Sequence, residues 1–579
     1  MKKLIVTYIF CLLFISFAFA QHDTAMYFLK QYKEVHFKFP KPTTEVMRKL
    51  IRMISIDHIR DNDSIYAIAN AEEFSAFLKI GIPYDVINPH PIEIQHNTLK
   101  GGVLYSTYPS YEEYVAMMNK FVQDYPDLCK LYSIGTTPNN HEILALKISD
   151  YASEKEAEPE FCFNSTMHGD ETAGYVLMLH LIDSLLTGYM NGEPRIQNMV
   201  DNVEIWILPN INPDGSYVYG NTAYHLLNYS TRGNANGADI NRRFPDPWDG
   251  LYPGGSWQTE NTIMMNFYKS HNFQLSANLH GGAEVINYPW DGYTLASPDY
   301  RGHPMNSWFQ YICKEYADTA KYWASKKYSS TYLTSITSSG ITNGGDWYYL
   351  FGGIQDYRNF YCHGRDVTME LSNSKTLSES YLIRYWNYNK QSFLNYIEQT
   401  LFGVRGIITD SATNQPIKAK VWVVGTDADS SEVYNTLPHG NYHRMLITGK
   451  YNLKFTAPGY KDKIIYDVSV TNKYTTILNV QLSNGIASDS PKKIDQTFSF
   501  TLSPNPTNQY TKVFVSDYVK QLQKPIYLNI TNCMGKTVYS NVYDSNHFFI
   551  DVSDYQSGMY VLNIEYNEKL YRRKLLVVR

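Results

Sequence analysis

A histidine and a glutamate three residues apart are the first candidates for chemistry in this chain. They lie in His168-Gly169-Asp170-Glu171, after a strand-like run that ends at Met167 and before an apolar run that begins near Tyr175. On a turn between two such elements both side chains can point at one ion, and imidazole with carboxylate suits zinc. This spacing is common by chance, and a catalytic zinc takes three protein ligands. A third ligand is therefore needed.

His280 is a candidate for that third ligand. It follows the strand-like run Leu275 to Leu279 and precedes two glycines, which let other groups approach closely. With His168 and Glu171 it would form a two-histidine, one-glutamate set that leaves the fourth zinc position to water.

The elements that would position these residues predict an α/β domain. Strand-like and helix-like runs alternate from about Tyr105 to Leu401, which indicates a sheet with helices on both faces. The run Tyr175 to Leu186 is apolar almost all round and predicts a buried helix. A further helix is expected at 111–121, and strands are expected at 161–167, 203–208, 275–279 and 367–371.

Additional units are expected before this domain. A signal peptide is predicted over 1–20, with a membrane anchor as the alternative. Its features are two lysines, Lys2 and Lys3, the apolar run Leu4 to Phe19 and the small-residue site Ala18-Phe19-Ala20. No later run is expected to cross a membrane. Residues 21–100 predict a small α+β unit, with a strand at 34–39 and helices at 45–54 and 71–78. The main domain is then expected over 101–401.

The pattern changes after Phe402, where period-two alternation replaces helical spacing. It predicts a β-sandwich over 402–483, a polar linker over 484–497 and a second all-β unit over 498–579. Strands are expected at 420–424, 451–455, 464–468 and 569–578.

Composition narrows the class of protein. The chain has 579 residues, 44% of them hydrophobic and 18% charged, which indicates several globular domains. A formal net charge of -5 gives no reason to expect nucleic-acid binding. Without Cys11 of the leader, five scattered cysteines remain, which is neither a disulfide framework nor a cysteine-ligated metal site.

Several further motifs occur in order around the candidate ligands, and with them the region 105–400 resembles the zinc carboxypeptidases, more closely the regulatory (N/E) subfamily. The matching strings are Asn212-Pro213-Asp214-Gly215, Asn234 to Arg242, Tyr288-Pro289-Trp290-Asp291, Asn343-Gly344, Gly352 to Asp356 and Met369-Glu370-Leu371. The resemblance implies a mixed sheet and one catalytic Zn²⁺ held by His168, Glu171 and His280.

The resemblance also implies the groups that act on the reacting bond. Glu370 matches the general base that takes a proton from the attacking water and passes it to the leaving amine. Arg232 matches the residue that stabilises the oxyanion. Asp239 matches a carboxylate that would hold a zinc-bound imidazole through its other N–H.

A second set of matched residues would bind the substrate. Asn241 and Arg242 match a clamp for a free C-terminal carboxylate, since a guanidinium reads a carboxylate bidentately. Tyr348 matches a mobile tyrosine over the substrate, although its neighbour Tyr349 is a plausible misassignment. Asp291, with Gln355 at the pocket floor, matches an acidic residue that would favour C-terminal Lys or Arg. The alternative is an ordinary turn aspartate before Gly292.

Some residues depart from the family pattern. Asp170 stands where relatives usually have Asn, and His141-Glu142 stands where they often have Gly-Arg. His180 and His363 lie outside the motifs and are interpreted as packing residues, and Arg243 as structural.

The flanking units carry resemblances of their own. Residues 402–482 resemble the transthyretin-like domain that follows the catalytic domain in the N/E subfamily, through 403–410 and 457–460. Residues 498–579 resemble the C-terminal sorting domain of type IX secretion substrates, through 502–507 and 557–562, which implies a Gram-negative cell and export to the surface or medium. The segment 21–100 occupies the place of a propeptide.

The function expected from the sequence is a secreted zinc metallocarboxypeptidase that acts on peptide or protein C-termini. Two alternatives remain: a catalytically silent surface binding or adhesion protein, and an amidase or carboxypeptidase acting on cell-wall peptides. The expected partners are substrate C-termini and the secretion machinery.

Overall fold

The computed structural model describes residues 21–60, 64–88, 105–292, 302–484, 500–515, 526–532, 536–543, 547–553, 555–566 and 569–578. The chain divides into two compact units, one of residues 1–293 and 301–485, the other of 294–300 and 486–579. The predicted signal peptide and nearly all of the predicted linker lie outside the described residues.

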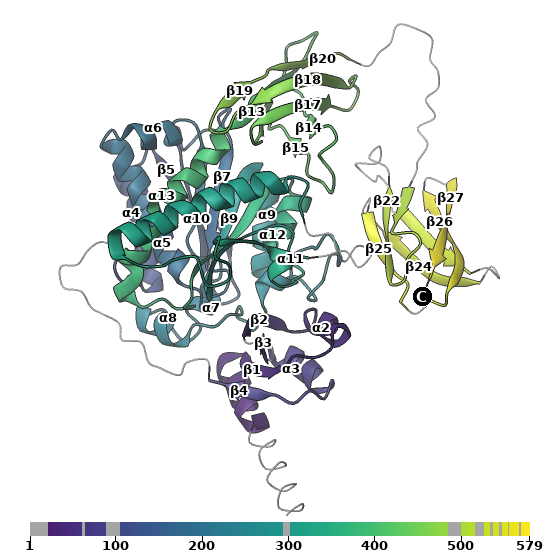
Figure 1. Ribbon diagram of the computed structural model, residues 1–579, viewed down its shortest axis with the longest axis horizontal. Coiled ribbons are helices and arrows are strands. Elements are labelled where there is room, and N and C mark those ends of the chain that lie inside the picture. The colour runs from purple at the N-terminus through teal and green to yellow at the C-terminus, as the bar shows by residue number, and fades with distance from the viewer. Residues whose placement is uncertain are drawn as a thin grey trace, which may run out of the picture. The chain divides into compact units, whose positions relative to one another are not determined.

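An eight-stranded mixed sheet forms the centre of the first unit (Figure 1). Its order is β11-β10-β12-β9-β7-β8-β6-β5. The inner neighbours β12, β9, β7 and β8 run parallel, whereas β6 pairs antiparallel with β8 and β10 with β12. The strands are β5 (Cys129–Thr136), β6 (Glu142–Ile148), β7 (Glu160–Ser165), β8 (Glu204–Leu208), β9 (Phe273–His280), β10 (Ala283–Tyr288), β11 (Ile341–Asn343) and β12 (Arg365–Ser372). The α/β fold class expected from the sequence is confirmed.

Helices cover both faces of this sheet. One hydrophobic cluster joins the sheet to α4 (Tyr111–Asp124), α5 (Ala173–Met190), α10 (Asn306–Tyr328) and α13 (Glu379–Glu398). A second cluster joins the other face to α9 (Thr259–Ser270) and α12 (Ile354–Tyr361). Shorter helices are α6 (Pro194–Val200), α7 (Pro213–Ser216), α8 (Ala223–Tyr229) and α11 (Gly344–Trp347), with 3-10 turns η1 (Ile240–Arg242) and η2 (Gln399–Leu401).

Helix α5 is the buried helix that the apolar run Tyr175 to Leu186 predicts. By length and composition it could cross a membrane, with a mean hydropathy of 1.2 over 18 residues. In the fold 72% of that window is buried, so the helix lies in the core between the sheet and α13. Its all-round apolar surface is explained by packing on every side.

The N-terminal part of the same unit is a small α+β fold. Its sheet has the order β2-β3-β1-β4 and is antiparallel throughout. The elements are β1 (Val35–Pro40), α2 (Thr44–Leu50), β2 (Ser55–Arg60), β3 (Ser64–Ala69), α3 (Ala71–Leu78) and β4 (Asp85–Ile87). The helix predicted over 45–54 ends at Leu50, because Ile54 is buried in a turn and Ser55 begins β2.

The chain after Leu401 is all-β. Two four-stranded sheets form a sandwich whose core is continuous with that of the mixed-sheet domain. One sheet has the order β16-β13-β19, with β20 also paired to β13, and the other has the order β15-β14-β17-β18. The strands are β13 (Gly403–Asp410), β14 (Lys420–Val423), β15 (Val433–Tyr434), β16 (Asn441–Arg444), β17 (Gly449–Thr456), β18 (Lys463–Val470), β19 (Thr475–Ile477) and β20 (Val480–Leu482).

The second unit is also a sandwich with its own hydrophobic cluster. Its sheets are β21-β22-β25 and β24-β23-β26-β27. The strands are β21 (Phe500–Ser503), β22 (Tyr510–Val515), β23 (Ile526–Thr531), β24 (Thr537–Tyr543), β25 (His547–Asp551), β26 (Gly558–Tyr566) and β27 (Lys569–Val577).

The cysteines of the described ranges form no bridge. Cys129, Cys162, Cys313 and Cys362 are free thiols, the first three buried. Cys533 falls outside the described residues.

Candidate metal centre and substrate pocket

Three inner strands of the mixed sheet bring the candidate chemical groups to one edge. His168 follows the end of β7 by three residues, and His280 is the last residue of β9. Glu370, in β12, is the register partner of His280 across a parallel pair. Because the carboxyl ends of parallel strands meet at one sheet edge, residues more than 200 positions apart become neighbours.

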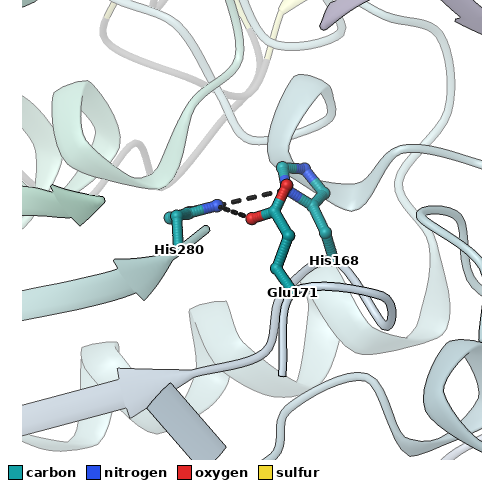
Figure 2. A group of neighbouring side chains, drawn as sticks. All are labelled: His168, Glu171 and His280. Atoms are coloured by element: carbon teal, nitrogen blue, oxygen red, sulfur yellow. Dashed lines mark hydrogen bonds and ion pairs between the residues drawn. The ribbon is translucent and has the colours of Figure 1, made fainter. Parts of the chain in front are cut away.

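The side chains of His168, Glu171 and His280 converge on one point (Figure 2). The Nδ1 atoms of the two histidines are 3.1 Å apart. The carboxylate of Glu171 lies 2.9 Å from Nδ1 of His168 and 2.7 Å from Nδ1 of His280. Three potential ligand atoms facing one another in buried surroundings form a donor set that suits a cation.

The outward nitrogens of the two imidazoles support this assignment. Nε2 of His168 donates to Oδ1 of Asp239 at 3.0 Å, which leaves the lone pair of its Nδ1 directed at the other ligands. In His280 it is Nδ1 that faces Glu171, at 2.7 Å, whereas Nε2 is buried without a hydrogen-bond partner among the described residues. Both rings therefore offer Nδ1 to the centre, and the three residues fit a zinc ion.

The loop that carries His168 is held by close backbone packing. A Cβ at Gly169 would lie 2.2 Å from the carbonyl carbon of Gly215, so only glycine fits. The amide of Asn212, which caps α7, donates to the carbonyl oxygens of Met167 and Gly233. The NPDG motif thus ties the ligand loop to the segment that follows Arg232.

Arg232 lies directly beside the ligands. One guanidinium nitrogen, NH1, donates to Oε1 of Glu171 at 3.0 Å, and Nε donates to Asp239 at 3.0 Å. Burial opposes its charge, but Asp239 and Glu171 outweigh burial and raise the pKa of Arg232 well above its usual value. The side chain is a fixed cation at the metal centre.

Glu370 is a buried carboxylate that faces the same cavity. It is 8% exposed, and its Oε2 has no hydrogen-bond partner among the described residues. Burial, and then repulsion from Glu171, raise its pKa well above the usual value. A carboxylate with a high proton affinity and a free oxygen is suited to take a proton.

A cavity of about 430 Å³ opens in front of these groups. Asn241, Arg242 and Tyr348 line it together with the three candidate ligands, Arg232 and Glu370. Asn241 Oδ1 accepts from the backbone N–H of Ile354 at 2.9 Å, which orients its amide. Tyr348 lines the cavity, whereas Tyr349 is 37% exposed, which favours Tyr348 for the substrate contact.

Asp291 and Gln355 do not line the cavity itself. They lie behind Asn287, which does: Nε2 of Gln355 donates to Asp291 at 2.7 Å and to Asn287 at 3.3 Å. Burial raises the pKa of Asp291 to about 7, and Asp246 adds to this while Arg242 opposes it. Asp356, which accepts from the backbone N–H groups of residues 291 and 292, has its own pKa raised by burial and by Asp291. Two buried carboxyl groups with raised proton affinity therefore lie next to each other behind Asn287.

Sequence reasoning missed the residues that the N-terminal fold contributes to the site. Asp57 lines the cavity, with its carboxylate 3.6 Å from NH1 of Arg232. The Ser55 hydroxyl accepts from Nε of Arg232, and Glu34 accepts from the backbone N–H groups of Arg232 and Gly233. No motif marks these residues, because their role depends on docking between two separately folded parts.

Two further pairs hold the N-terminal fold in place. Arg52 pairs with Asp249 at 2.7 Å, and Arg243 pairs with Glu73 at 2.7 Å. The structural interpretation of Arg243 agrees with this contact. His180 and His363 also lie in packing positions: His180 stacks on Trp386, and His363 bonds to a backbone carbonyl of the β-sandwich.

A second group of potential ligands is already neutralised. Glu160, Glu204 and His271 lie close enough to hold an ion. However, Lys155 pairs with Glu160, and Lys147 pairs with Glu204 at 2.9 Å. Satisfied ion pairs explain this cluster without a metal.

Comparison with known proteins agrees with the geometry. A zinc carboxypeptidase model matches residues 114–392, a carboxypeptidase regulatory-like domain model matches 403–483, and a secretion system C-terminal sorting domain model matches 501–578. The carboxypeptidase A structure from Helicoverpa armigera is 16% identical, with a TM-score of 0.47 over 63% of this chain and 96% of that chain.

Two relatives match this chain over most of their own length, and a third, longer one over a smaller part. The human carboxypeptidase N catalytic chain is 32% identical over 66% of this chain and 87% of that protein. Carboxypeptidase SOL1 of Arabidopsis thaliana is 33% identical over 62% of this chain and 68% of that protein. Mouse carboxypeptidase D is 31% identical over 65% of this chain, which spans only 27% of that longer protein. This chain belongs to the zinc carboxypeptidase family.

Proposed function

We propose that this chain is an exported zinc metallocarboxypeptidase that removes a C-terminal residue, with a preference for Lys or Arg. The observation that carries the proposal is that one cavity brings these groups together. The metal triad, Glu370, Asn241 and Arg242 all line it, and the buried carboxylate of Asp291 is linked through Gln355 to Asn287 of the lining.

Each group has a role that follows from its position. A zinc ion bound by the triad would supply an acidified water and polarise a carbonyl. Glu370, with its free oxygen, takes a proton from water and returns it to the departing amine. Arg232, fixed by Asp239 and Glu171, stabilises negative charge on the carbonyl oxygen.

Other residues in and behind the cavity lining select the substrate. Arg242, with the oriented amide of Asn241, provides planar donors for a free carboxylate, which restricts cleavage to chain ends. The charge of Asp291 would stabilise a Lys or Arg side chain that reaches past Asn287. Tyr348 closes over the bound residue from the cavity wall.

The N-terminal fold restricts access to this cavity in the intact chain. Asp57, Ser55 and Glu34 all contact Arg232 or its backbone, where a substrate carbonyl has to bind. The segment 21–100 therefore acts as a propeptide, and its displacement or removal increases activity.

The remaining segments serve export and folding. The signal peptide over 1–20 and the sorting domain at the C-terminus take the protein to the cell surface or the medium. The transthyretin-like sandwich, which shares a continuous core with the catalytic domain, supports the fold of that domain.

Hydrolysis of blocked peptides ending in Arg, Leu or D-Ala tests this function. The assay is run on the full chain before and after limited proteolysis, with and without a chelator. Chelator-sensitive release of Arg ahead of Leu is expected. Preferential release of D-Ala would favour a cell-wall enzyme, and no hydrolysis of any peptide by the metal-loaded, processed protein would favour a silent binding protein.

A further inference from the structure

Lys375 is a buried cation that contacts Asp57, a residue of the cavity lining, and the proposed reaction has no use for it. Its Nζ lies 2.7 Å from the Asp57 carboxylate and 3.4 Å from that of Asp170. The lysine side chain is 21% exposed and that of Asp57 15% exposed, but the ammonium nitrogen itself is buried. The same oxygen of Asp57 lies 3.6 Å from NH1 of Arg232. A carboxylate of the chain itself thus lies between two fixed cations at the metal centre.

The position of Lys375 is built into the ligand loops. Its carbonyl oxygen accepts from the backbone N–H of Thr172, and the hydroxyl of Thr376 donates to the carbonyl oxygen of Asp170. A Cβ at Gly282 would lie 3.5 Å from Cγ of Lys375, so the lysine stem runs along the glycines that follow His280. Asp170, which departs from the family pattern, holds the ammonium group from the other side.

These contacts place Lys375 behind Asp57 and Gly282, two residues that line the cavity. Arg242 and Asn287 line the part of the cavity that would receive the C-terminal residue, whereas Lys375 contacts the loops of the metal ligands. Asp57 contacts both Arg232 and Lys375, so a peptide whose C-terminus binds Arg242 and whose scissile carbonyl lies near Arg232 would continue into the place that Asp57 holds beside Lys375. The first side chain it can present there is that of its penultimate residue.

We propose that Lys375, positioned by Asp170, determines specificity for an acidic residue immediately before the C-terminal one. The preferred substrates are therefore peptides that end in Glu or Asp followed by the residue to be removed. Asp57 occupies this subsite in the intact chain as an internal carboxylate of the same chemistry. The inference rests on the proposed carboxypeptidase function and extends it to the upstream side of the cleaved bond.

The test uses the full-length, zinc-loaded chain with Asp57→Asn, which removes the competing carboxylate. Values of kcat/KM are compared for blocked peptides that differ only in a penultimate Glu or Gln before C-terminal Arg. We expect the Glu peptide to be favoured about fivefold, the upper range for a charge pair in contact with solvent. Adding Lys375→Met to the Asp57→Asn chain should reduce the Glu-to-Gln ratio to about one, whereas adding Lys375→Arg instead should keep it. The control is Lys120→Met in the same chain, which removes a lysine from a surface pair on α4 and should not change the ratio.

A binding measurement separates this inference from the proposed function. Calorimetry with the dipeptides Glu-Arg and Gln-Arg is performed on the full chain that carries Asp57→Asn and Glu370→Gln, in which turnover is expected to be slowed about 10²–10⁴-fold. Tighter binding of Glu-Arg that depends on Lys375 supports the subsite even if hydrolysis fails. Equal binding of both dipeptides, or equal kcat/KM for both peptides, overturns the proposal. The Glu-to-Gln ratio of the Asp57→Asn chain decides the question even if Lys375→Met does not fold.

Discussion

Replacing Asp57 by Asn should activate the intact chain. The change is nearly isosteric and removes only the charge that faces Lys375 at 2.7 Å and Arg232 at 3.6 Å. If the N-terminal fold blocks the cavity through these contacts, weakening them shifts the balance toward an open cavity. The open form is then available to substrate without any cut in the chain.

The size of the effect follows from the two distances. With an effective dielectric constant of about 20, the two attractions amount to roughly 6 and 5 kcal/mol before solvation is considered. Desolvation and the partial exposure of Asp57 and Lys375 cancel most of this, which leaves about 1–2 kcal/mol. Because 1.4 kcal/mol is a factor of ten, kcat/KM should rise about five- to thirtyfold. The pairs of Arg52 and Glu73 remain and keep the activation incomplete.

The assay is initial-rate hydrolysis of a peptide ending in Gln-Arg by full-length protein, with the neutral penultimate residue chosen to avoid a direct interaction with Lys375. Asp85→Asn is the matched control, because Asp85 belongs to the same fold but pairs at 3.9 Å with Lys38 on the exposed surface. The wild type and this control should share one low rate. Equal rates for the wild type and the Asp57→Asn chain, together with activation of both by proteolysis, would show that Asp57 does not hold the cavity closed.

Three other changes test the metal centre and the pocket. Glu370→Gln should lower kcat by about 10²–10⁴ without loss of zinc, because the residue acts on protons rather than on the ion; a zinc content that falls with activity would contradict this role. Asp291→Ala should reduce kcat/KM for C-terminal Arg at least about tenfold and leave C-terminal Leu nearly unchanged. Burial raises the pKa of Asp291 to about 7, so protonation below that pH removes its charge. In a pH profile, the ratio of kcat/KM for C-terminal Arg to kcat/KM for C-terminal Leu should therefore fall as the pH drops through 7. A ratio independent of pH from 5 to 9 would refute the assignment. Gly169→Ala should destabilise the fold by about 1–3 kcal/mol and weaken zinc binding in a chelator competition, because its Cβ would meet backbone at 2.2 Å; wild-type stability would show that the loop can yield.

Much of the candidate site could be recognised from the sequence because it uses short motifs at the ends of strands. His168 and Glu171 occur on one turn, and His280 ends a strand that alternation and glycines mark clearly. Such local signals also predicted four of the eight strands of the mixed sheet, β7, β8, β9 and β12, and the buried helix α5. The end of α2 was placed four residues too late, because the buried Ile54 belongs to a turn and not to the helix.

Other features depend on contacts between parts of the chain that carry no shared pattern. Asp57 and Lys375 are separated by more than 300 residues, and neither lies in a motif, yet they pair at the metal centre. The sequence also suggested that Asp291 and Gln355 form the pocket floor, whereas Asn287 stands between them and the cavity. Whether a residue lines a pocket or lies behind its wall depends on which other side chains pack in front of it. The spacing of residues along the chain does not contain this information.

The sequence by itself determined which residues are able to bind a metal ion, move a proton and hold a carboxylate, because these abilities belong to side-chain chemistry. Only the tertiary structure decided that an aspartate of the N-terminal fold lies between Arg232 and Lys375. The physical reason is that charge pairing acts over a few ångströms in space, and the distance between two residues in space is set by how separate folds pack together.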